Sequence, residues 1–389
     1  MASNLPGGEA GGASVVVIGG GVTGLSTAWW LARAGIDVIV IEKGVVGWEA
    51  SGRNGGGCTH HFSPLFPEEQ RLWPQMDELL GYPTEFQAHR IRLIGDDRAM
   101  EFSRGAMANA ARQGFKAEWL DAAQIAELVP LTDPQAFRAV YYHFGGHANP
   151  QRTVQAYAWA IQDKGGRIVQ HTVATGFERR GGKVVAVETD RGRFACDSLV
   201  IAAGPQTERI AAMLDVAIPT TAGRAEIMVT EAVPMMKIGG VDGAGLYGRQ
   251  TLRGNLVYGG GPHEWLPALG MTETPRASTP LLQNIATRIA RLFPKARHAR
   301  ALRSWSGIVE NTPDGRPIID RLRSPDNVVV ATLSSVGFGL SPASGRAIAE
   351  LVQHGQCSFA DLSTLRLSRF SNLEKDWRER RGWLPPDAE

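Results

Sequence analysis

Ser14-Val-Val-Val-Ile-Gly-Gly-Gly-Val-Thr-Gly24 is a short apolar run followed directly by a glycine-rich turn. A helical stretch continues from it to Ala34 and stops at Gly35, a residue typical of helix ends. Asp37-Val-Ile-Val-Ile41 is a second apolar run, and Glu42 comes directly after it. Strand, glycine-rich turn, helix, strand and acid in this order are typical of a dinucleotide-binding βαβ unit.

Each residue type in this unit has a physical role in binding a dinucleotide. The first glycine allows the turn, the second lets the backbone approach a pyrophosphate, and the third permits close packing of helix on strand. The pyrophosphate then meets free N–H groups at the helix N-terminus, and Glu42 accepts hydrogen bonds from the adenosine ribose. A purely structural glycine-rich turn is the alternative, and the motif does not distinguish NAD from FAD. The cofactor-binding residues predicted here are Gly19, Gly21, Val22, Thr23, Gly24, Glu42 and Lys43.

The bulk composition excludes several classes of protein. The 389 residues suggest two or three domains, at roughly 150 residues per domain. The net charge of +2, with acids and bases intermixed, lacks the basic stripe that nucleic-acid binding requires. Cys58, Cys196 and Cys357 are odd in number and far apart, which argues against a disulfide framework and against a metal site. We therefore expect a reducing, cytoplasmic compartment.

The apolar runs are too short for a membrane span, so only docking at the surface of the inner membrane stays open. Sections with α/β character alternate with sections richer in antiparallel-looking strands, as expected if one domain is interrupted twice by another. We predict a flexible leader at 1–12, a dinucleotide domain at 13–85, 150–215 and 305–365, a substrate domain at 86–149 and 216–304, and a charged tail at 366–389. The tail is solvated by default, and a partner-docking surface is the alternative reading.

Two local predictions concern the ends of elements. Arg167 to Val173 is predicted to be a strand. Ser341-Pro342 is predicted to open the last helix, with Ser341 as the N-cap and Pro342 at the first helical position.

Four stretches resemble one known family of flavoproteins. They are Glu49-Ala-Ser-Gly-Arg-Asn-Gly-Gly56, Leu199-Val-Ile-Ala-Ala-Gly204, Asn311-Thr-Pro-Asp-Gly-Arg-Pro-Ile-Ile319 and Ser335-Val-Gly-Phe-Gly-Leu-Ser-Pro342. Their order and spacing resemble the D-amino-acid-oxidase-like superfamily of FAD-dependent oxidoreductases, from about Ser14 to Val352. Agreement is closest with sarcosine oxidase β subunits and with opine or hydroxyproline dehydrogenase β subunits. The resemblance implies an α/β fold (α+β overall), in which a Rossmann-like FAD-binding domain is interrupted by a substrate domain with a mixed or antiparallel sheet.

The resemblance also implies further contacts with FAD. Val173 would meet the adenine through its backbone, and Ala203 and Gly204 would close over the adenosine. The last helix would point its N-terminus at the flavin C2=O, where a positive dipole end favours the reduced, anionic ring. Ser51, Arg53, Asn54 and Gly55 would line the diphosphate and flavin edge, and Gly337, Phe338, Gly339 and Leu340 would pass beside the ribityl chain and pyrimidine ring.

Departures from the family pattern bear on the reaction. The position of the cysteine that bonds flavin covalently in monomeric sarcosine oxidases falls near Gly307, so we expect non-covalent FAD. Asn255-Leu-Val-Tyr-Gly259 lacks the lysine that promotes reaction with oxygen. The family's carboxylate-binding lysine is Gly339 here, the substrate arginine of glycine oxidase falls near Val309, and the histidine that carries a second flavin appears as Val154. Oxygen chemistry and the usual carboxylate clamp are both put in question.

Oxidising an amine beside a flavin requires its C–H close to flavin N5 and a neutral nitrogen, which an apolar pocket favours. Cations or hydroxyls normally hold the substrate carboxylate. The catalytic candidates are Tyr247, Arg249, His60, His61 and Tyr258, with Arg224 and His263 as further polar residues of the strand-rich sections. Each has a non-catalytic alternative, as a structural or surface arginine, a core tyrosine or a histidine outside the site. Cys58 is interpreted as a small buried residue.

The sequence favours an FAD-dependent dehydrogenase of a small secondary amine or amino-acid derivative, such as an opine, an imino acid, or an N-methyl or D-amino acid. Hydride would pass to flavin N5, and electrons would pass on to a partner subunit that holds FMN or an iron–sulfur cluster. An oxidase that forms hydrogen peroxide is the first alternative. A non-catalytic, FAD-containing regulatory subunit is the second, and a nicotinamide-linked dehydrogenase is disfavoured because the C-terminal motif belongs with flavin.

Overall fold

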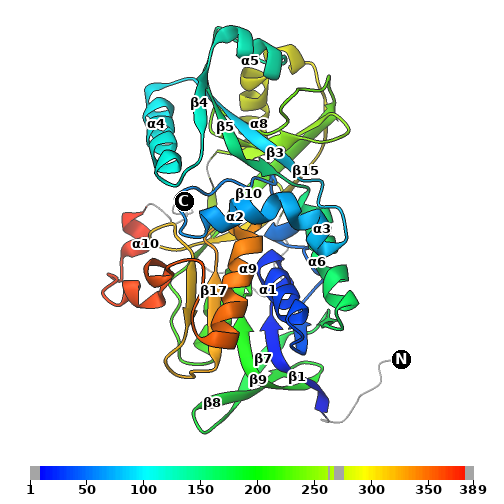
Figure 1. Cartoon of the computed structure of the whole chain (residues 1–389), viewed down its shortest axis with the longest axis vertical. Helices are drawn as coiled ribbons and strands as arrows, with labels where there is room; N and C mark the ends of the chain where they lie inside the picture. The colour runs from blue at the N-terminus through cyan, green and yellow to red at the C-terminus, as the bar shows by residue number, and fades with distance from the viewer. Residues whose placement is uncertain (1–8, 262, 267–275, 382–389) are drawn as a thin grey trace.

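The computed structural model describes residues 9–261, 263–266 and 276–381. The elements form two bodies stacked along the long axis of the molecule (Figure 1). The lower body in that view is built on a largely parallel sheet, and the upper body on sheets that are mostly antiparallel. The fold is thus α/β with a second, mixed-sheet region, as the sequence predicts.

The lower sheet has the order β16-β17-β9-β1-β2-β6, with β7 and β8 added beside β9. Strands β17, β9, β1, β2 and β6 run parallel to one another, which is the arrangement of a doubly wound sheet. The strands are β1 (Glu9–Ile18), β2 (Val38–Ile41), β6 (Arg167–Val169), β7 (Ala174–Arg180), β8 (Lys183–Thr189), β9 (Gly192–Ile201), β16 (Ile318–Arg321) and β17 (Val328–Thr332).

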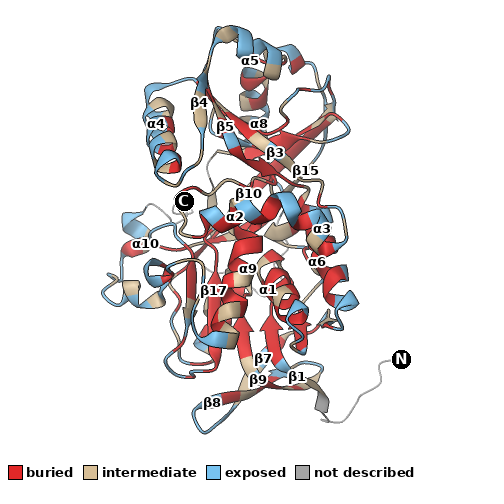
Figure 2. Cartoon of the chain, viewed as in Figure 1, coloured by how far each residue is buried: buried red, intermediate tan, exposed pale blue. Residues whose placement is uncertain are grey.

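Helices cover this sheet on both faces. One apolar core joins the sheet to α1 (Val22–Arg33), α6 (Pro150–Asp163) and α9 (Gly337–His354). A second core lies under α7 (Thr207–Ala212) on the other face. Strand β17 is accordingly buried along its whole length (Figure 2), and all four residues of β2 are apolar and buried.

The upper body contains two sheets, with orders β11-β3-β5-β4 and β12-β13-β10-β14, and β15 pairs with β10. The strands are β3 (Gln87–Ile94), β4 (Ala117–Leu120), β5 (Arg138–His147), β10 (Thr221–Ala232), β11 (Val241–Asp242), β12 (Leu246–Gln250), β13 (Asn255–Gly260), β14 (Glu264–Leu266) and β15 (Ala301–Asn311). The helices are α4 (Asp97–Arg112), α5 (Ala122–Leu128) and α8 (Thr279–Leu292). The remaining helices are α2 (Phe66–Leu72), α3 (Met76–Leu80) and α10 (Trp377–Arg380).

Three predicted boundaries differ from the structure. Residues 9–12 belong to β1 and pair with β9, for example Gly12 with Ala195, so the predicted leader is too long; its first eight residues lie outside the described part of the chain. The predicted boundary at residue 305 falls inside β15, because that strand pairs with β10 along its whole length. Part of the predicted tail folds back, since buried Trp377 anchors α10 and Arg378 donates 2.7 Å to the Thr220 carbonyl.

Two predicted elements are also corrected. The strand predicted over Arg167 to Val173 ends at Val169, and Val173 lies just before β7. The last helix begins at Gly337, so Ser341 is not its N-cap and Pro342 lies inside it. Pro342 has no N–H for the Phe338 carbonyl. The helix continues nonetheless, packed along α1, whose Trp30 and Ser26 side chains donate to the carbonyls of Pro342 and Ser341.

Helices α1 and α9 touch through a glycine, which generates a stability prediction. A methyl group at Gly345 would overlap Ser26, including its backbone. Gly345→Ala should therefore lower the free energy of unfolding by about 1–3 kcal/mol, because the two helices must separate. Gly105→Ala is the matched control, since it lies in a helix with open space around it and should stabilise by up to about 1 kcal/mol. Urea unfolding curves of both variants check this, and equal effects would contradict it.

Candidate active site

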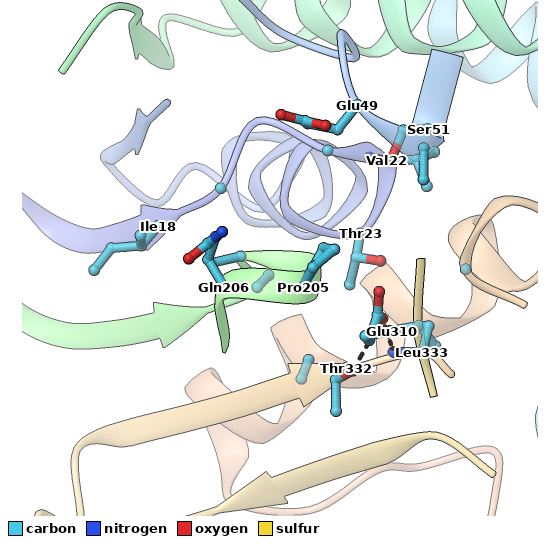
Figure 3. Close-up of a pocket in the computed structure, with 18 of the residues that line it drawn as sticks. Ile18, Val22, Thr23, Glu49, Ser51, Pro205, Gln206, Glu310, Thr332 and Leu333 are labelled. Carbon is cyan, nitrogen blue, oxygen red and sulfur yellow. Dashed lines mark hydrogen bonds between the residues drawn. The ribbon is translucent and has the colours of Figure 1, made fainter. Parts of the chain in front are cut away.

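A cleft of about 1230 Å³ lies at the carboxyl ends of the parallel strands in the lower body. Figure 3 shows its walls: Val22 and Thr23 of α1, Pro205 and Gln206 after β9, and Glu310 beside Thr332. These segments are far apart in sequence and meet only because the parallel strands bring their ends together. Most of the predicted cofactor residues line it: Gly19, Gly21, Val22, Thr23, Glu42, Lys43, Ser51, Asn54, Ala203, Gly204, Gly337 and Phe338.

The N-terminus of α1 is prepared for an anion. The N-cap residue, Gly21, has no side chain, and no acidic residue lies in the first turn of the helix. Ser51 Oγ accepts the Val22 N–H at 2.9 Å and would lie 3.0 Å from a Cβ on Gly21. A Cβ on Gly24 would overlap the Gly19 carbonyl, so close packing of helix on turn requires a glycine there. Gly24 thus packs rather than lines the cleft.

The N-terminus of α9 opens on the same cleft. Gly337 and Phe338, in its first turn, are part of the lining, and its N-cap residue, Val336, makes no side-chain cap. Two helix N-termini, each with N–H groups that lack an intrahelical partner and with a positive dipole end, therefore face one space. This arrangement fits a ligand that carries negative charge at two places along its length, as FAD does in its diphosphate and in its reduced ring.

Glu42 is held at the end of β2 by two backbone N–H groups, those of Gly20 and Gly44, both at 2.7 Å. Burial raises the pKa of this carboxyl, and the two N–H groups oppose that rise. Each carboxylate oxygen keeps a lone pair for a ribose hydroxyl. Lys43 beside it pairs with Glu49 at 3.2 Å, which places both charges at the rim of the same cleft.

Some predicted cofactor residues lie elsewhere: Arg53, Gly55, Val173, Gly339 and Leu340 do not line the cleft. The Arg53 guanidinium lies over the Trp48 ring at 4.5 Å and donates to the Ser306 carbonyl. The Val173 N–H donates 2.8 Å to the Asp190 carboxylate, and the lining is formed by its neighbours Thr172 and Ala174. Leu340 is fully buried in the core of the lower body.

Glu310 is a lining residue that the sequence did not point to. Its Oε1 accepts from the Thr332 hydroxyl at 2.9 Å and from the Leu333 N–H at 3.0 Å (Figure 3). Burial raises the pKa of this carboxyl. The residue directly precedes the Asn311-Thr-Pro-Asp-Gly stretch, and the only signal for it was that proximity.

The predicted histidine pair divides into two environments. His60 lies against the start of α9, where a Cβ on Gly339 would overlap its ring. Its Nδ1 is 2.7 Å from Oε1 of the fully buried Glu69, which also accepts the His60 N–H at 3.1 Å. His61 is buried among Phe62, Phe66 and Phe102.

Neither ring nitrogen of His61 has a hydrogen-bond partner among the described residues. Burial, then the charge of Arg92 and then that of His60, lower the pKa of His61 to about 4. The imidazole is therefore neutral at pH 7.

The candidates on β12 both face the glycine-rich loop after Asn54. Tyr247 has its ring edge 3.2 Å from the position of a Cβ on Gly55. Its side chain is 40% accessible, yet burial by surrounding protein raises the pKa of its phenol, a combination typical of a side chain that faces an enclosed space. Arg249 is buried and donates 2.9 Å to the Gly55 carbonyl, and burial lowers the pKa of its guanidinium to about 10. It supports the loop.

The other polar candidates have structural roles. Tyr258 is fully buried, and its hydroxyl donates 2.9 Å to the Val241 carbonyl, so it is a core residue. Arg224 pairs with Glu264 across β10 and β14. His263 stacks edge-on against Trp265. Cys58 is buried, and burial raises the pKa of its thiol well above the usual range, as expected for a small core residue.

The sheet order, the glycine turn and the two helix N-termini at one cleft define a dinucleotide-binding protein of the doubly wound α/β class. The family of FAD-dependent oxidoreductases known as DAO matches residues 14–351, and the chain belongs to this family. It is an enzyme family that depends on FAD, and the cleft described above fits that cofactor.

Two curated relatives are similar over nearly the whole chain. The beta chain of sarcosine oxidase from Rhizobium meliloti (strain 1021) is 28% identical over 371 residues, covering 92% of this chain and 88% of that protein. An opine oxidase subunit from Rhizobium meliloti is 26% identical over 385 residues, covering 92% and 97%.

Solved structures share the fold. Glycine oxidase from Geobacillus kaustophilus aligns with a TM-score of 0.82 at 24% identity, covering 92% of this chain and 98% of that one. L-proline dehydrogenase from P. horikoshii aligns with a TM-score of 0.81 at 24% identity, covering 96% and 99%. Within the described residues, no helix has the length and apolarity that a membrane crossing needs, and no cluster of His, Cys, Asp and Glu is arranged around a metal position.

The buried Glu42 carboxylate generates a binding prediction. Glu42→Gln places an amide NH₂ against one of two backbone N–H groups and removes the charge, so apoprotein should bind FAD about tenfold or more weakly. Glu49→Gln, at the rim of the same cleft, is the matched control and should bind nearly as the parent does. Quenching of FAD fluorescence on titration with apoprotein measures both constants. Equal affinities of the two variants would show that Glu42 does not meet the ribose.

The neutral His61 generates a prediction about acid stability. Its folded pKa of about 4 lies below the ordinary value of 6.5, so its contribution is full above pH 6.5 and is lost as the pH falls toward 4. Between pH 7 and 4.5, the unfolding free energy of the parent should therefore fall by about 2 kcal/mol more than that of His61→Phe. Exposed His298→Phe is the control and should follow the parent. Urea unfolding at the two pH values decides the matter.

Proposed function

We propose that this chain is an FAD-dependent dehydrogenase that oxidises the carbon–nitrogen bond of a small secondary amine or amino-acid derivative. The observation that carries the proposal is the junction at Gly55. Asn54 lines the cofactor cleft and the next residue, Gly55, does not. Tyr247 on β12 packs against Gly55, and His60 packs nearby against the start of α9. Relatives named for sarcosine, opine and glycine oxidation all act on a carbon–nitrogen bond, which supports this class of substrate.

When bound, FAD supplies an acceptor for hydride at its N5 atom. The chain's own residues bind and orient. The N-terminus of α1 and Glu42 would hold the diphosphate and the adenosine ribose, and the start of α9 would stabilise negative charge beside the ring. The aromatic rings around His61 disfavour a protonated amine near them, which keeps the substrate nitrogen neutral.

His60 is the positioning residue that we assign to the substrate side. Glu69 fixes the orientation of the ring through Nδ1, which leaves Nε2 for a substrate group. The ring lies at the start of α9, where a Cβ on Gly339 would overlap it, and it can hold a polar group of the substrate by a hydrogen bond at Nε2.

The choice of dehydrogenase over oxidase rests on two positions, one on β13 and one at Gly307, where related oxidases carry a lysine and a cysteine. Strand β13 offers no lysine, and its Tyr258 is a core residue. Gly307, at the position expected for a flavin-bonding cysteine, packs against Ala50 and supports non-covalent FAD. Amine oxidation can proceed without oxygen if another carrier accepts the electrons.

We further propose a hetero-oligomer in which a partner subunit accepts electrons through FMN or an iron–sulfur cluster. Relatives named as single subunits of sarcosine oxidase and opine oxidase support assembly with other chains. Val154 lines a groove together with Trp48 and Trp159, two tryptophans that are about half exposed. Exposed aromatic surface of this kind is more stable against a partner protein than against water. The three free thiols are consistent with a reducing cytoplasmic compartment.

The proposal predicts that bound flavin bleaches under anaerobic conditions when N-methyl amino acids, opines and imino acids are added. Reoxidation by an artificial dye should be much faster than reoxidation by oxygen, because the oxygen-activating lysine is missing. His60→Gln should slow bleaching by about tenfold or more through lost orientation, while His298→Gln should not. Stopped-flow absorbance measures the rates.

The alternatives give different results in the same experiment. Stoichiometric hydrogen peroxide from the holoenzyme would identify an oxidase. Flavin that stays oxidised with every amine offered would instead favour a regulatory subunit, in which FAD is a structural element.

A further inference from the structure

A second cleft, of about 2020 Å³, lies in the upper body between the start of α4, strand β3 and helix α8. Figure 1 shows these elements above the largely parallel sheet of the lower body. Four arginines line this cleft against two carboxylates: Arg92, Arg98, Arg288 and Arg291 against Asp96 and Asp242. The cleft therefore carries an excess of positive charge.

The two carboxylates are already engaged. Asp242 accepts from Nε and from Nη2 of the buried Arg90 and is thereby neutralised. Arg92 reaches the same carboxylate only at 3.9 Å. Asp96 caps α4 through the Ala99 N–H at 2.8 Å. The Asp242 carboxylate thus pairs with two guanidinium groups of β3, and its ion pair with Arg92 is the weaker of the two.

Buried polar atoms without partners gather around Arg92. Its Nε has no hydrogen-bond partner among the described residues, and neither do the two ring nitrogens of His61, on which the charge of Arg92 acts. The guanidinium lies 4.8 Å from the Phe102 ring centroid, which fixes its plane. An unsatisfied buried donor costs about 1–3 kcal/mol, so an anion that accepts from these groups would be bound favourably.

Tyr247 connects this cleft to the cofactor. It lines the cleft together with Arg92, and it also packs on Gly55 in the glycine-rich loop after Asn54. A substrate whose reacting carbon lies beside the flavin and against Tyr247 would extend into the arginine-lined space. Its far end would meet Arg92, whereas a carboxylate next to the reacting carbon would stay on the side of His60.

We propose that Arg92 binds a second carboxylate, carried by the substrate on its nitrogen substituent, so that the preferred substrate is a di-acid secondary amine. This inference rests on the proposed function. A carboxylate is favoured over a point anion because the planar guanidinium fork pairs with it through two parallel hydrogen bonds. Arg98, Arg288 and Arg291 add a field that attracts such a group into the cleft.

A matched pair of substrates tests the proposal on the holoenzyme. N-(2-Carboxyethyl)glycine carries the second acid, and N-propylglycine is similar in length but lacks it. Anaerobic stopped-flow bleaching should give the di-acid a dissociation constant lower by about tenfold or more. Arg92→Met should abolish this preference, so that the two substrates give nearly equal dissociation constants. Arg104→Met, at an exposed position of α4, is the control and should keep the preference.

Binding of inert acids separates failure of this inference from failure of the proposed function. Glutarate and pentanoate differ by one carboxylate and cannot be oxidised at nitrogen, so calorimetric titration reports on Arg92 even if no amine bleaches the flavin. Glutarate should bind the parent more tightly than pentanoate does, and Arg92→Met should lose that difference. Arg92→Lys keeps the charge but not the fork and should retain part of it, with unchanged FAD content. Equal binding of the two acids by the parent, or an equal preference in Arg92→Met, would overturn the inference.

Discussion

The arrangement on which the rest of the structure depends is the approach of two helix N-termini to one edge of a parallel sheet. Gly24 lets α1 pack directly on the turn that follows β1, and Gly345 lets α9 pack directly on α1. Both helices therefore begin at the same cleft, and neither has an N-cap residue whose side chain caps it. Unsatisfied N–H groups are costly when buried, so the cleft is stable only if a polar ligand or water completes it. The cofactor is in this sense part of the fold.

The substrate region follows from the same constraint. The loop that leaves Asn54 is fixed from the far side, where Arg249 donates to the Gly55 carbonyl. Arg90 donates to the Gly146 carbonyl of β5, which also accepts the Cys58 N–H at the end of this loop. These buried guanidinium groups support the backbone through hydrogen bonds. Strand β12 places Tyr247 against the loop on the same face as Arg249. The upper body thus presents side chains to the ring end of the cleft while the lower body binds the rest of the dinucleotide.

The sequence predicted the lower body well because its signals are local. A glycine turn between apolar strands specifies backbone geometry within thirty residues, and Glu42 follows directly from it. Val173 and Arg53 do not line the cleft, because the Val173 N–H donates to Asp190 and the Arg53 guanidinium lies over the Trp48 ring. Asp190 reaches Val173 through the pairing of β7 with β8, which the residues around Val173 do not specify by themselves. The start of α9 was misplaced since Pro342 looks like a first-turn proline, whereas packing on α1 extends the helix past it.

The substrate side was less predictable because its charges are decided by competition across the fold. Arg92 and Arg90 are alike in sequence and are separated by one residue on β3. They differ in their distance to Asp242 on β11, and Arg90 also donates to two backbone carbonyls. The acid satisfies one guanidinium fully and the other weakly, and the weaker one lines the open cleft. Tyr258 and Tyr247 diverge for the same kind of reason, because one hydroxyl finds the Val241 carbonyl in the core and the other faces open space. Specificity in such a site is set by which polar groups the fold leaves unpaired, and that can be read only once the sheets have been assembled.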